Sequence, residues 1–184
     1  MTVRSVFWRG LQWPSLEHLS LEERADGSLA DALILGAYEG RPFRVRYQVT
    51  VDDQWTAQSL VFEEELSRAR LELFRTDGGW RHEDGRSVPE VGDAADVDIA
   101  ATPFTNTLPI RRLGLEPGRS AEITVLYLSV FPEVTVSAAR QRYTRLLDGR
   151  YRYESMDSGF TVDLHVDSEG LVLDYPGIWE RVPS

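Results

Sequence analysis

The chain has 184 residues, of which 42% are hydrophobic and 27% charged, a composition typical of a globular protein with one substantial core. Its 30 acidic and 20 basic side chains give a formal net charge of −10. That charge repels phosphate backbones and anionic lipid surfaces, so we expect no nucleic-acid partner. The chain has no cysteine, which excludes disulfides, thiolate metal ligands and a cysteine nucleophile.

The beginning of the chain carries two arginines around a short apolar run, Val6 to Trp8, and no apolar stretch with a small-residue cleavage site follows. No apolar run approaches the roughly 20 residues that a membrane helix needs. We therefore expect a cytoplasmic protein without membrane insertion, and we interpret residues 1–184 as one domain.

Strands are predicted wherever apolar and polar residues alternate with period two. In Phe43–Val51, five apolar residues lie on one face and four polar residues on the other, as in a half-buried strand. In chain order, the other alternating runs are Leu16–Leu21, Ser28–Leu35, Gln58–Phe62, Arg70–Phe74, Glu122–Val130, Phe160–Val166 and Leu171–Tyr175. Turns containing glycine with aspartate, glutamate or proline separate many of them, which favours hairpins and meanders over βαβ units. We expect at most two short helices, at Leu11–His18 and Val134–Arg142.

The two halves of the chain show a weak internal similarity in the order of their predicted elements. Arg70–Gly85 and Thr161–Gly177 share an order of strand, turn and second strand, and a long alternating pair precedes each. Two duplicated meanders joined by Asp93–Leu113 would produce this pattern, although any two hairpins share part of it. The sequence predicts an all-β fold with a mainly antiparallel sheet.

The segment from Asp96 to Leu113 differs from the rest because it contains two prolines, three threonines and an asparagine. Prolines disfavour helix interiors and central strands. The apolar content is nevertheless too high for a floppy linker. We expect an ordered, partly buried segment that crosses the molecule without regular secondary structure.

Asp96 and Asp98 are two residues apart, so on a strand both would project from the same face. Paired carboxylates can bind a divalent cation or share acid–base work. The residue pattern of a calcium loop is missing, and we favour a structural role in which a carboxylate accepts backbone hydrogen bonds or pairs with Arg111 or Arg112. We therefore assign no metal site.

The three histidines, His18, His82 and His165, lack the spacing of a metal-binding helix. The sequence has no nucleophile elbow, dinucleotide fingerprint or Walker loop. We assign no catalytic residue and expect no cofactor. A hydrolase or isomerase that uses Asp96 or Asp98 with a histidine remains an alternative.

Several segments resemble one known family. They are Val6–Arg9, Glu17–Leu19, Phe43–Tyr47, Asp96–Ile99, Thr102–Arg112, Gln141–Thr144, Tyr151–Glu154, Gly159–Thr161 and Gly170–Pro176. The family is the "Putative glycolipid-binding" family, long catalogued as a bacterial domain of unknown function. The likeness covers almost the whole chain, and its most specific part is the run from Thr102 to Pro109.

The resemblance implies a single large curved sheet that forms a β-roll or half-barrel, similar to carriers of acyl chains. It also implies non-catalytic binding of a small amphipathic ligand, glycolipid-like or fatty-acyl, in a cavity of that sheet. Aromatic rings with a polar tip suit such a ligand, and core packing is the competing interpretation for each ring. As ring-lining candidates we select Trp8, Tyr47, Trp55, Phe104, Tyr143 and Tyr153, and as headgroup candidates Asn106, Arg111 and Arg112. A protein-interaction module with an exposed sheet edge is a further alternative.

Overall fold

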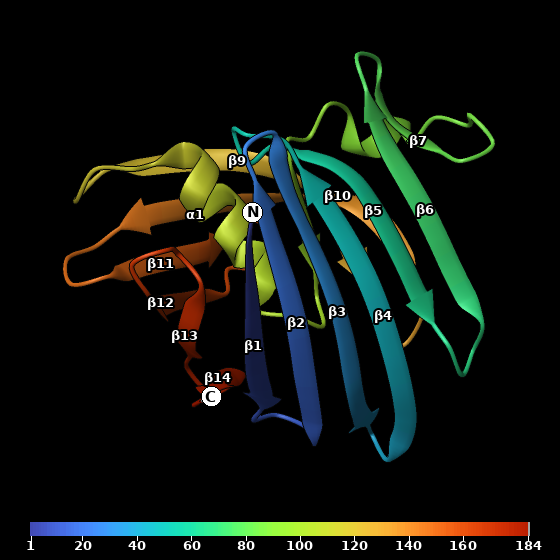
Figure 1. The fold of residues 1–184 in the computed structure, drawn as a ribbon, viewed down its shortest axis with the longest axis horizontal. Coiled ribbons are helices and arrows are strands. Elements are labelled where there is room, and N and C mark those ends of the chain that lie inside the picture. Colours follow the sequence, from blue (N-terminus) through green and yellow to red (C-terminus); the bar gives the residue numbers. More distant parts are fainter. Residues whose placement is uncertain (184) are drawn as a thin grey trace.

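The computed structural model describes residues 1–183, which form one 14-stranded sheet (Figure 1). The strands are β1 (Thr2–Gly10), β2 (Ser15–Arg24), β3 (Gly27–Tyr38), β4 (Arg41–Val51), β5 (Ala57–Glu64), β6 (Ala69–Thr76), β7 (Gly79–His82), β8 (Asp96–Ile99), β9 (Ser120–Ser129), β10 (Thr135–Arg145), β11 (Arg150–Ser155), β12 (Thr161–Val166), β13 (Val172–Tyr175) and β14 (Trp179–Val182). The helical segments are the 3₁₀ turns η1 (Pro89–Val91) and η2 (Phe104–Asn106) and the helix α1 (Thr107–Leu113).

Two antiparallel meanders build the sheet. Strands β1 to β7 form the first and β9 to β14 the second, and they join where β1 pairs with β14. Strand β8 adds to the outer edge of the second meander, parallel to β9. The ends of the strand order, β7 and β8, do not pair, so the sheet curves without closing into a barrel. The predicted all-β, mainly antiparallel fold is confirmed, and each of the eight alternating runs coincides with a strand, three of them extending one residue beyond it.

Both expected helices are wrong. Val134–Arg142 falls mostly within β10, which pairs with β9 on one side and β11 on the other. Leu11–His18 forms a tight turn followed by the start of β2. Local helix preference is weak in both segments, and pairing with neighbouring strands outweighs it.

The segment from Asp96 to Leu113 crosses the molecule as expected, but the expectation of irregular structure is wrong. It contains β8, η2 and α1. Pro109 is only the third residue of α1, where a backbone N–H has no intrahelical partner to lose. Gly114 ends the helix in the left-handed conformation, with φ of 51°.

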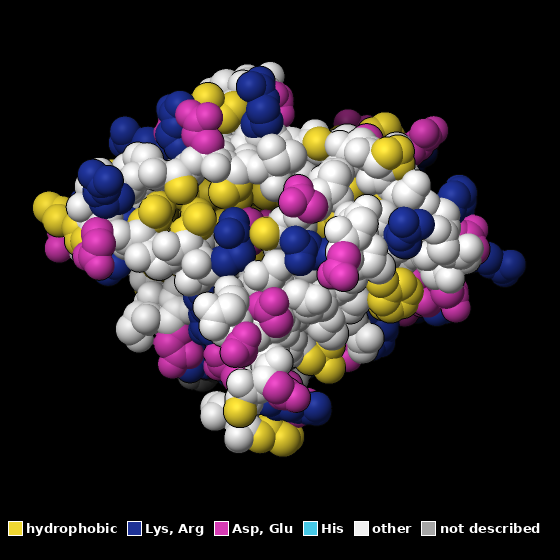
Figure 2. All heavy atoms as spheres, turned by 90° about the horizontal axis from the view of Figure 1, so that it is seen from above, with side chains coloured by type: hydrophobic (Ala, Val, Ile, Leu, Met, Phe, Trp, Pro, Cys, Tyr) yellow, Lys and Arg dark blue, Asp and Glu magenta, His cyan; other side chains and the backbone are white. Residues whose placement is uncertain are grey.

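Basic and acidic side chains are interspersed over the face seen in Figure 2. Ion pairs connect elements that are distant in the chain: Arg4 of β1 pairs with Glu169 in the turn between β12 and β13, and Arg111 of α1 pairs with Glu23 of β2. Within residues 1–183, no helix is both long enough and apolar enough to cross a membrane.

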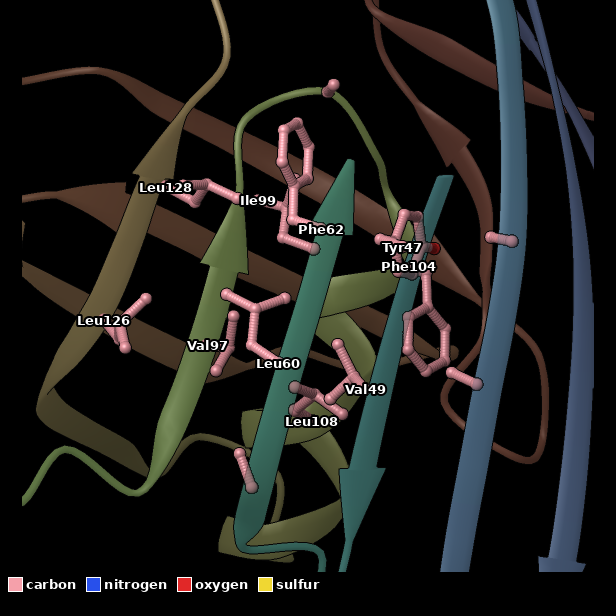
Figure 3. Packing of buried hydrophobic residues seen from close by; sticks show 14 of the residues in the cluster. Tyr47, Val49, Leu60, Phe62, Val97, Ile99, Phe104, Leu108, Leu126 and Leu128 are labelled. Carbon is pink, nitrogen blue, oxygen red and sulfur yellow. The ribbon is translucent and has the colours of Figure 1, made fainter. Parts of the chain in front are cut away.

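The crossing segment fills the concave side of the first meander. Phe104 and Leu108 point toward Val49 and Leu60 of β4 and β5 (Figure 3), and all four side chains are at most 1% exposed. Ile110 of the same helix packs instead into a second apolar cluster under β10 to β12. The segment therefore forms a layer between the two halves of the sheet.

Candidate functional site

A cavity of about 520 Å³ lies on the concave side of the second meander. Its walls come from β8 and the start of the crossing segment, from β9, β10 and β11, from the turn between β13 and β14, and from the turn between β1 and β2. Its lining residues include Trp13, Asp98, Thr102, Asn106, Tyr127, Ala139, Gln141, Tyr153, Tyr175 and Ile178. This volume falls in the range of small-molecule sites, roughly 300–1,000 Å³.

Asp98 supplies the carboxylate at the inner end of the cavity. Alternation along β8 turns Val97 and Ile99 into the apolar core and leaves Asp98 on the cavity side. Its Oδ2 accepts a hydrogen bond of 2.6 Å from Nε2 of Gln141, and its Oδ1 accepts one of 3.1 Å from the hydroxyl of Thr105. Burial raises the pKa of Asp98, and these two hydrogen bonds offset part of that rise.

Three tyrosines line the same cavity as this carboxylate. Tyr127, Tyr153 and Tyr175 line the cavity, and within the described chain their hydroxyls make no hydrogen bond to protein. Tyr143 lies behind them, where its hydroxyl donates to Oδ1 of Asn106 across 2.9 Å. Burial, and next the negative charge of Asp98, raise the pKa of all four tyrosines, so their hydroxyls stay protonated and can donate.

Apolar and aromatic side chains also line the cavity. Trp13 from the turn between β1 and β2, Ile178 from the turn between β13 and β14, and Phe160 from the turn between β11 and β12 all line it. Phe160 is 41% exposed, whereas Gln141 is only 1% exposed. The lining is thus amphipathic, and its exposed members include polar Gln12, Asp157 and Ser158 as well as Phe160.

Formal charge in the cavity is of one sign. Asp98 and Asp157 are its ionisable acids, and no arginine or histidine is among its lining residues. Arg140 lies outside and pairs with Asp157. Within the described residues, no group of three or more His, Cys, Asp or Glu side chains could hold a metal ion. The three histidines do not line this cavity, so the geometry brings no histidine to Asp98.

The structure brings two of the nine candidate ligand residues into this cavity, Asn106 and Tyr153. Trp8, Tyr47, Phe104 and Tyr143 are at most 1% exposed and pack against protein. Ligand contact by these four stays a prediction.

Trp55 and Arg111 contact each other outside this cavity. The guanidinium of Arg111 stacks over the Trp55 ring, 4.1 Å from its centroid, beside a separate hollow of about 710 Å³. Arg111 also pairs with Glu23 across 2.5 Å. Arg111 is therefore already neutralised by acidic side chains of the protein, Glu23 and Glu169.

Arg112 forms an ion pair with Asp96, the other of the two neighbouring carboxylates on β8. Its Nε and Nη2 donate to Oδ1 and Oδ2 of Asp96 across 3.0 and 2.5 Å, and the Asp96 side chain is 1% exposed. Burial raises the pKa of Asp96, and Arg112 opposes that rise. The favoured structural pairing of this acid with Arg111 or Arg112 is therefore present, with Arg112.

Sequence reasoning missed the role of Asp98 with Gln141 as the inner wall, and it missed Tyr127, Tyr175 and Trp13 as lining residues. Gln141 shares a strand face with buried Tyr143, and a polar residue at an inward position was the available signal. Because a helix was predicted over Val134–Arg142, the inward position of Gln141 on a strand was not recognised.

Glu17 is a second buried carboxyl next to the cavity wall. Its Oε1 accepts hydrogen bonds from the hydroxyls of Tyr47 at 2.6 Å and Thr102 at 2.7 Å. Its Oε2 is buried and has no partner within residues 1–183. Burial raises the pKa of Glu17 to about 8, so the carboxyl is protonated at neutral pH.

The structure defines the protein as an all-β protein whose described residues form a single open, mainly antiparallel sheet. Residues 5–181 match the family described as "Putative glycolipid-binding", and the chain belongs to that family. The resemblance seen in the sequence is thereby confirmed.

One solved structure shows the same fold. It is the crystal structure, at 1.80 Å resolution, of a DUF1089 family protein (PA1994) from Pseudomonas aeruginosa. The two proteins share 38% sequence identity over 91% of this chain and 92% of that chain, with a TM-score of 0.81. No curated protein matches the chain.

Proposed function

We propose that the protein binds a small amphipathic ligand, glycolipid-like in character, in the cavity beneath the second meander, without chemical conversion. The observation that carries this proposal is that the cavity lining combines hydrogen-bonding groups, among them Asp98 and Gln141, with the aromatic rings of Trp13 and Phe160. A molecule with one hydrogen-bonding end and one apolar end matches both surfaces. The family description supports the same class of ligand.

The proposal is tested by asking what the purified protein holds and what stabilises it. Organic extraction followed by mass spectrometry should recover an amphipathic molecule. Alkyl glycosides should raise the melting temperature, since a ligand that binds only the folded state stabilises it by mass action.

A plugged variant provides the matched control for the position of the site. Ala139 faces the cavity from β10, so Ala139→Phe should fill it and abolish the thermal shift. Ala25→Phe adds the same ring at an exposed turn and should leave the shift intact. Absence of extractable ligand together with no shift from any amphiphile would overturn the proposal, as would an unchanged shift in Ala139→Phe.

A further inference from the structure

We propose that a second cavity, at the end of the first meander away from α1, binds a small alkylammonium ion between the carboxylate of Glu64 and a wall of aromatic rings. This cavity shares no lining residue with the one described above. Ligand binding in either cavity can therefore be measured without the other.

The second cavity has a volume of about 610 Å³ and lies between three turns. The β3–β4 and β5–β6 turns of the first meander form two of its sides (Figure 1), and the loop from β9 to β10 of the second meander forms the third. The volume falls in the range of small-molecule sites. A ligand in this cavity would contact both meanders.

Three aromatic rings form one wall of this cavity. The ring of Phe131 stacks parallel to that of Tyr38, with centroids 4.7 Å apart, and meets the ring of Phe43 at 4.8 Å with the planes tilted by 57°. Phe43 is buried, whereas Tyr38 and Phe131 are half-buried. The face of an aromatic ring carries partial negative charge and attracts cations, and quaternary ammonium groups are recognised in proteins by such rings.

Glu64 places a fixed negative charge in the same cavity. The residue is 6% exposed and belongs to the lining. Its Oε1 accepts hydrogen bonds from the backbone N–H groups of Arg44 and Leu66 across 3.1 and 3.3 Å, and its Oε2 accepts one from that of Ser67 across 2.5 Å. Burial acts to raise the pKa of Glu64, but the hydrogen bonds that it accepts outweigh burial and hold that pKa below its usual range. The carboxylate is therefore ionised at neutral pH.

The protein supplies no cation to this carboxylate. Within residues 1–183, Glu64 accepts only from uncharged backbone donors and forms no ion pair. Glu39 and Glu133 line the exposed rim, and Arg41 is the single basic side chain among the described lining residues. Carboxylates are rarely buried unless they are paired. The excess of acids therefore favours a cation as the ligand.

The rest of the lining determines what kind of cation fits. Pro42, Val130, Pro132 and Val134 add apolar surface beside the rings. A metal ion would gain nothing from this surface, and the described residues contain no group of three or more acidic, histidine or cysteine side chains that could hold one. An ammonium nitrogen that carries methyl or methylene groups matches the carboxylate through its charge and the apolar walls through its carbon atoms.

The role of the charge is tested in the wild-type protein with a pair of ligands of equal shape. Choline and dimethylbutanol, in which a carbon atom replaces the nitrogen, are titrated by calorimetry at low ionic strength. We expect choline to bind at least about tenfold more tightly, because the cation–π contact and the ion pair are both lost in the alcohol. Equal or tighter binding of dimethylbutanol, or no saturable binding of choline, overturns the proposal and leaves the proposed function standing.

Phosphocholine distinguishes a free ammonium compound from a phospholipid headgroup. Its phosphate would lie beside the carboxylates of Glu39, Glu64 and Glu133, so it should bind more weakly than choline despite carrying the same ammonium group. Binding as tight as that of choline would contradict the charge selection proposed for this cavity.

Variants connect the effect to the named residues. Glu64→Gln removes the charge at nearly constant size and should weaken choline binding about tenfold while leaving dimethylbutanol binding unchanged. Glu116→Gln, at an exposed turn outside the cavity, is the matched control and should change neither. If Glu64→Gln does not fold by circular dichroism, Phe131→Leu removes a ring and keeps an apolar side chain, so it should weaken choline more than dimethylbutanol. Unchanged choline affinity, or equal losses for both ligands, contradicts the proposal.

Discussion

The hydroxyl of Thr102 donates to Oε1 of Glu17 across 2.7 Å, although the two residues are 85 positions apart in the chain. The bond attaches the crossing segment to β2 of the first meander. Three residues later, Thr105 donates to Asp98 at the wall of the cavity. Two carboxyl groups thus accept hydrogen bonds from the stretch between Thr102 and Thr105, Glu17 from β2 and Asp98 from β8.

Glu17 should make stability depend on pH. Its pKa rises from 4.5 to about 8 on folding, so below pH 4.5 both states hold the proton. Between these values the unfolded chain ionises first and stability falls, by up to about 1.4 kcal/mol per pH unit, with no further loss well above pH 8. Urea unfolding from pH 5 to 9 should show this decline, and Glu17→Gln should remove it. Glu133→Gln, an exposed control, should keep it. Identical slopes in wild type and Glu17→Gln would refute the assignment.

Arg112 should matter more than an exposed arginine does. Arg112→Leu leaves the Asp96 carboxylate buried without its partner and should lower the free energy of unfolding by about 2–4 kcal/mol, somewhat below a fully buried pair because the Arg112 side chain keeps 21% exposure. Removing both charges with Asp96→Leu should recover part of the loss. Arg70→Leu, whose arginine is 63% exposed, should have no measurable effect by the same urea titration.

Trp8 should act on stability and not on ligand affinity. Its ring is fully buried, and its Nε1 donates to the carbonyl oxygen of Val172 across 2.8 Å. Trp8→Phe leaves that carbonyl unpaired and opens a small void, so we expect a loss of about 2 kcal/mol. Calorimetry on the folded variant should give an unchanged affinity for octyl glucoside. A large affinity loss without destabilisation would place Trp8 in the binding site instead.

Trp55 should show backbone strain. Its φ is 64°, in the left-handed region that side chains rarely adopt, while its ring covers Arg111. Trp55→Ala and Trp55→Gly both remove the ring, and only glycine relieves the strain. The glycine variant should therefore be more stable than the alanine variant by about 0.5–1 kcal/mol in thermal or urea unfolding. Equal stabilities would mean that the turn stores no strain.

Strand faces were predictable because alternation reports directly on burial. Phe43–Val51 presented its apolar face to the core as β4. Asp96 and Asp98 likewise share one face of β8, as their spacing predicted. Such inferences need only the residues that are adjacent in the sequence, and no knowledge of distant contacts.

Features that depend on distant partners were not predictable. Pro109 suggested irregular structure, since nothing local indicates that it falls in the first turn of a helix. The inward position of Gln141 depends on the pairing of β10 with both neighbours, and its bond to Asp98 spans 43 positions. The aromatic candidates were ambiguous for the same reason: Tyr47 and Tyr153 look alike in sequence, and only the path of the crossing segment buries one and exposes the other to the cavity.

The pairing of β1 with β14 also affects how the protein can fold during its synthesis. Arg9 and Glu180 meet across this pair although 171 positions separate them, so the contact can form only after residue 180 has left the ribosome. Until then β1 presents an unpaired edge to other nascent chains. Contacts of such long range slow folding, and an unpaired strand edge favours association with other chains. The yield of folded protein should therefore depend on expression rate and on chaperone capacity more than its final stability would suggest.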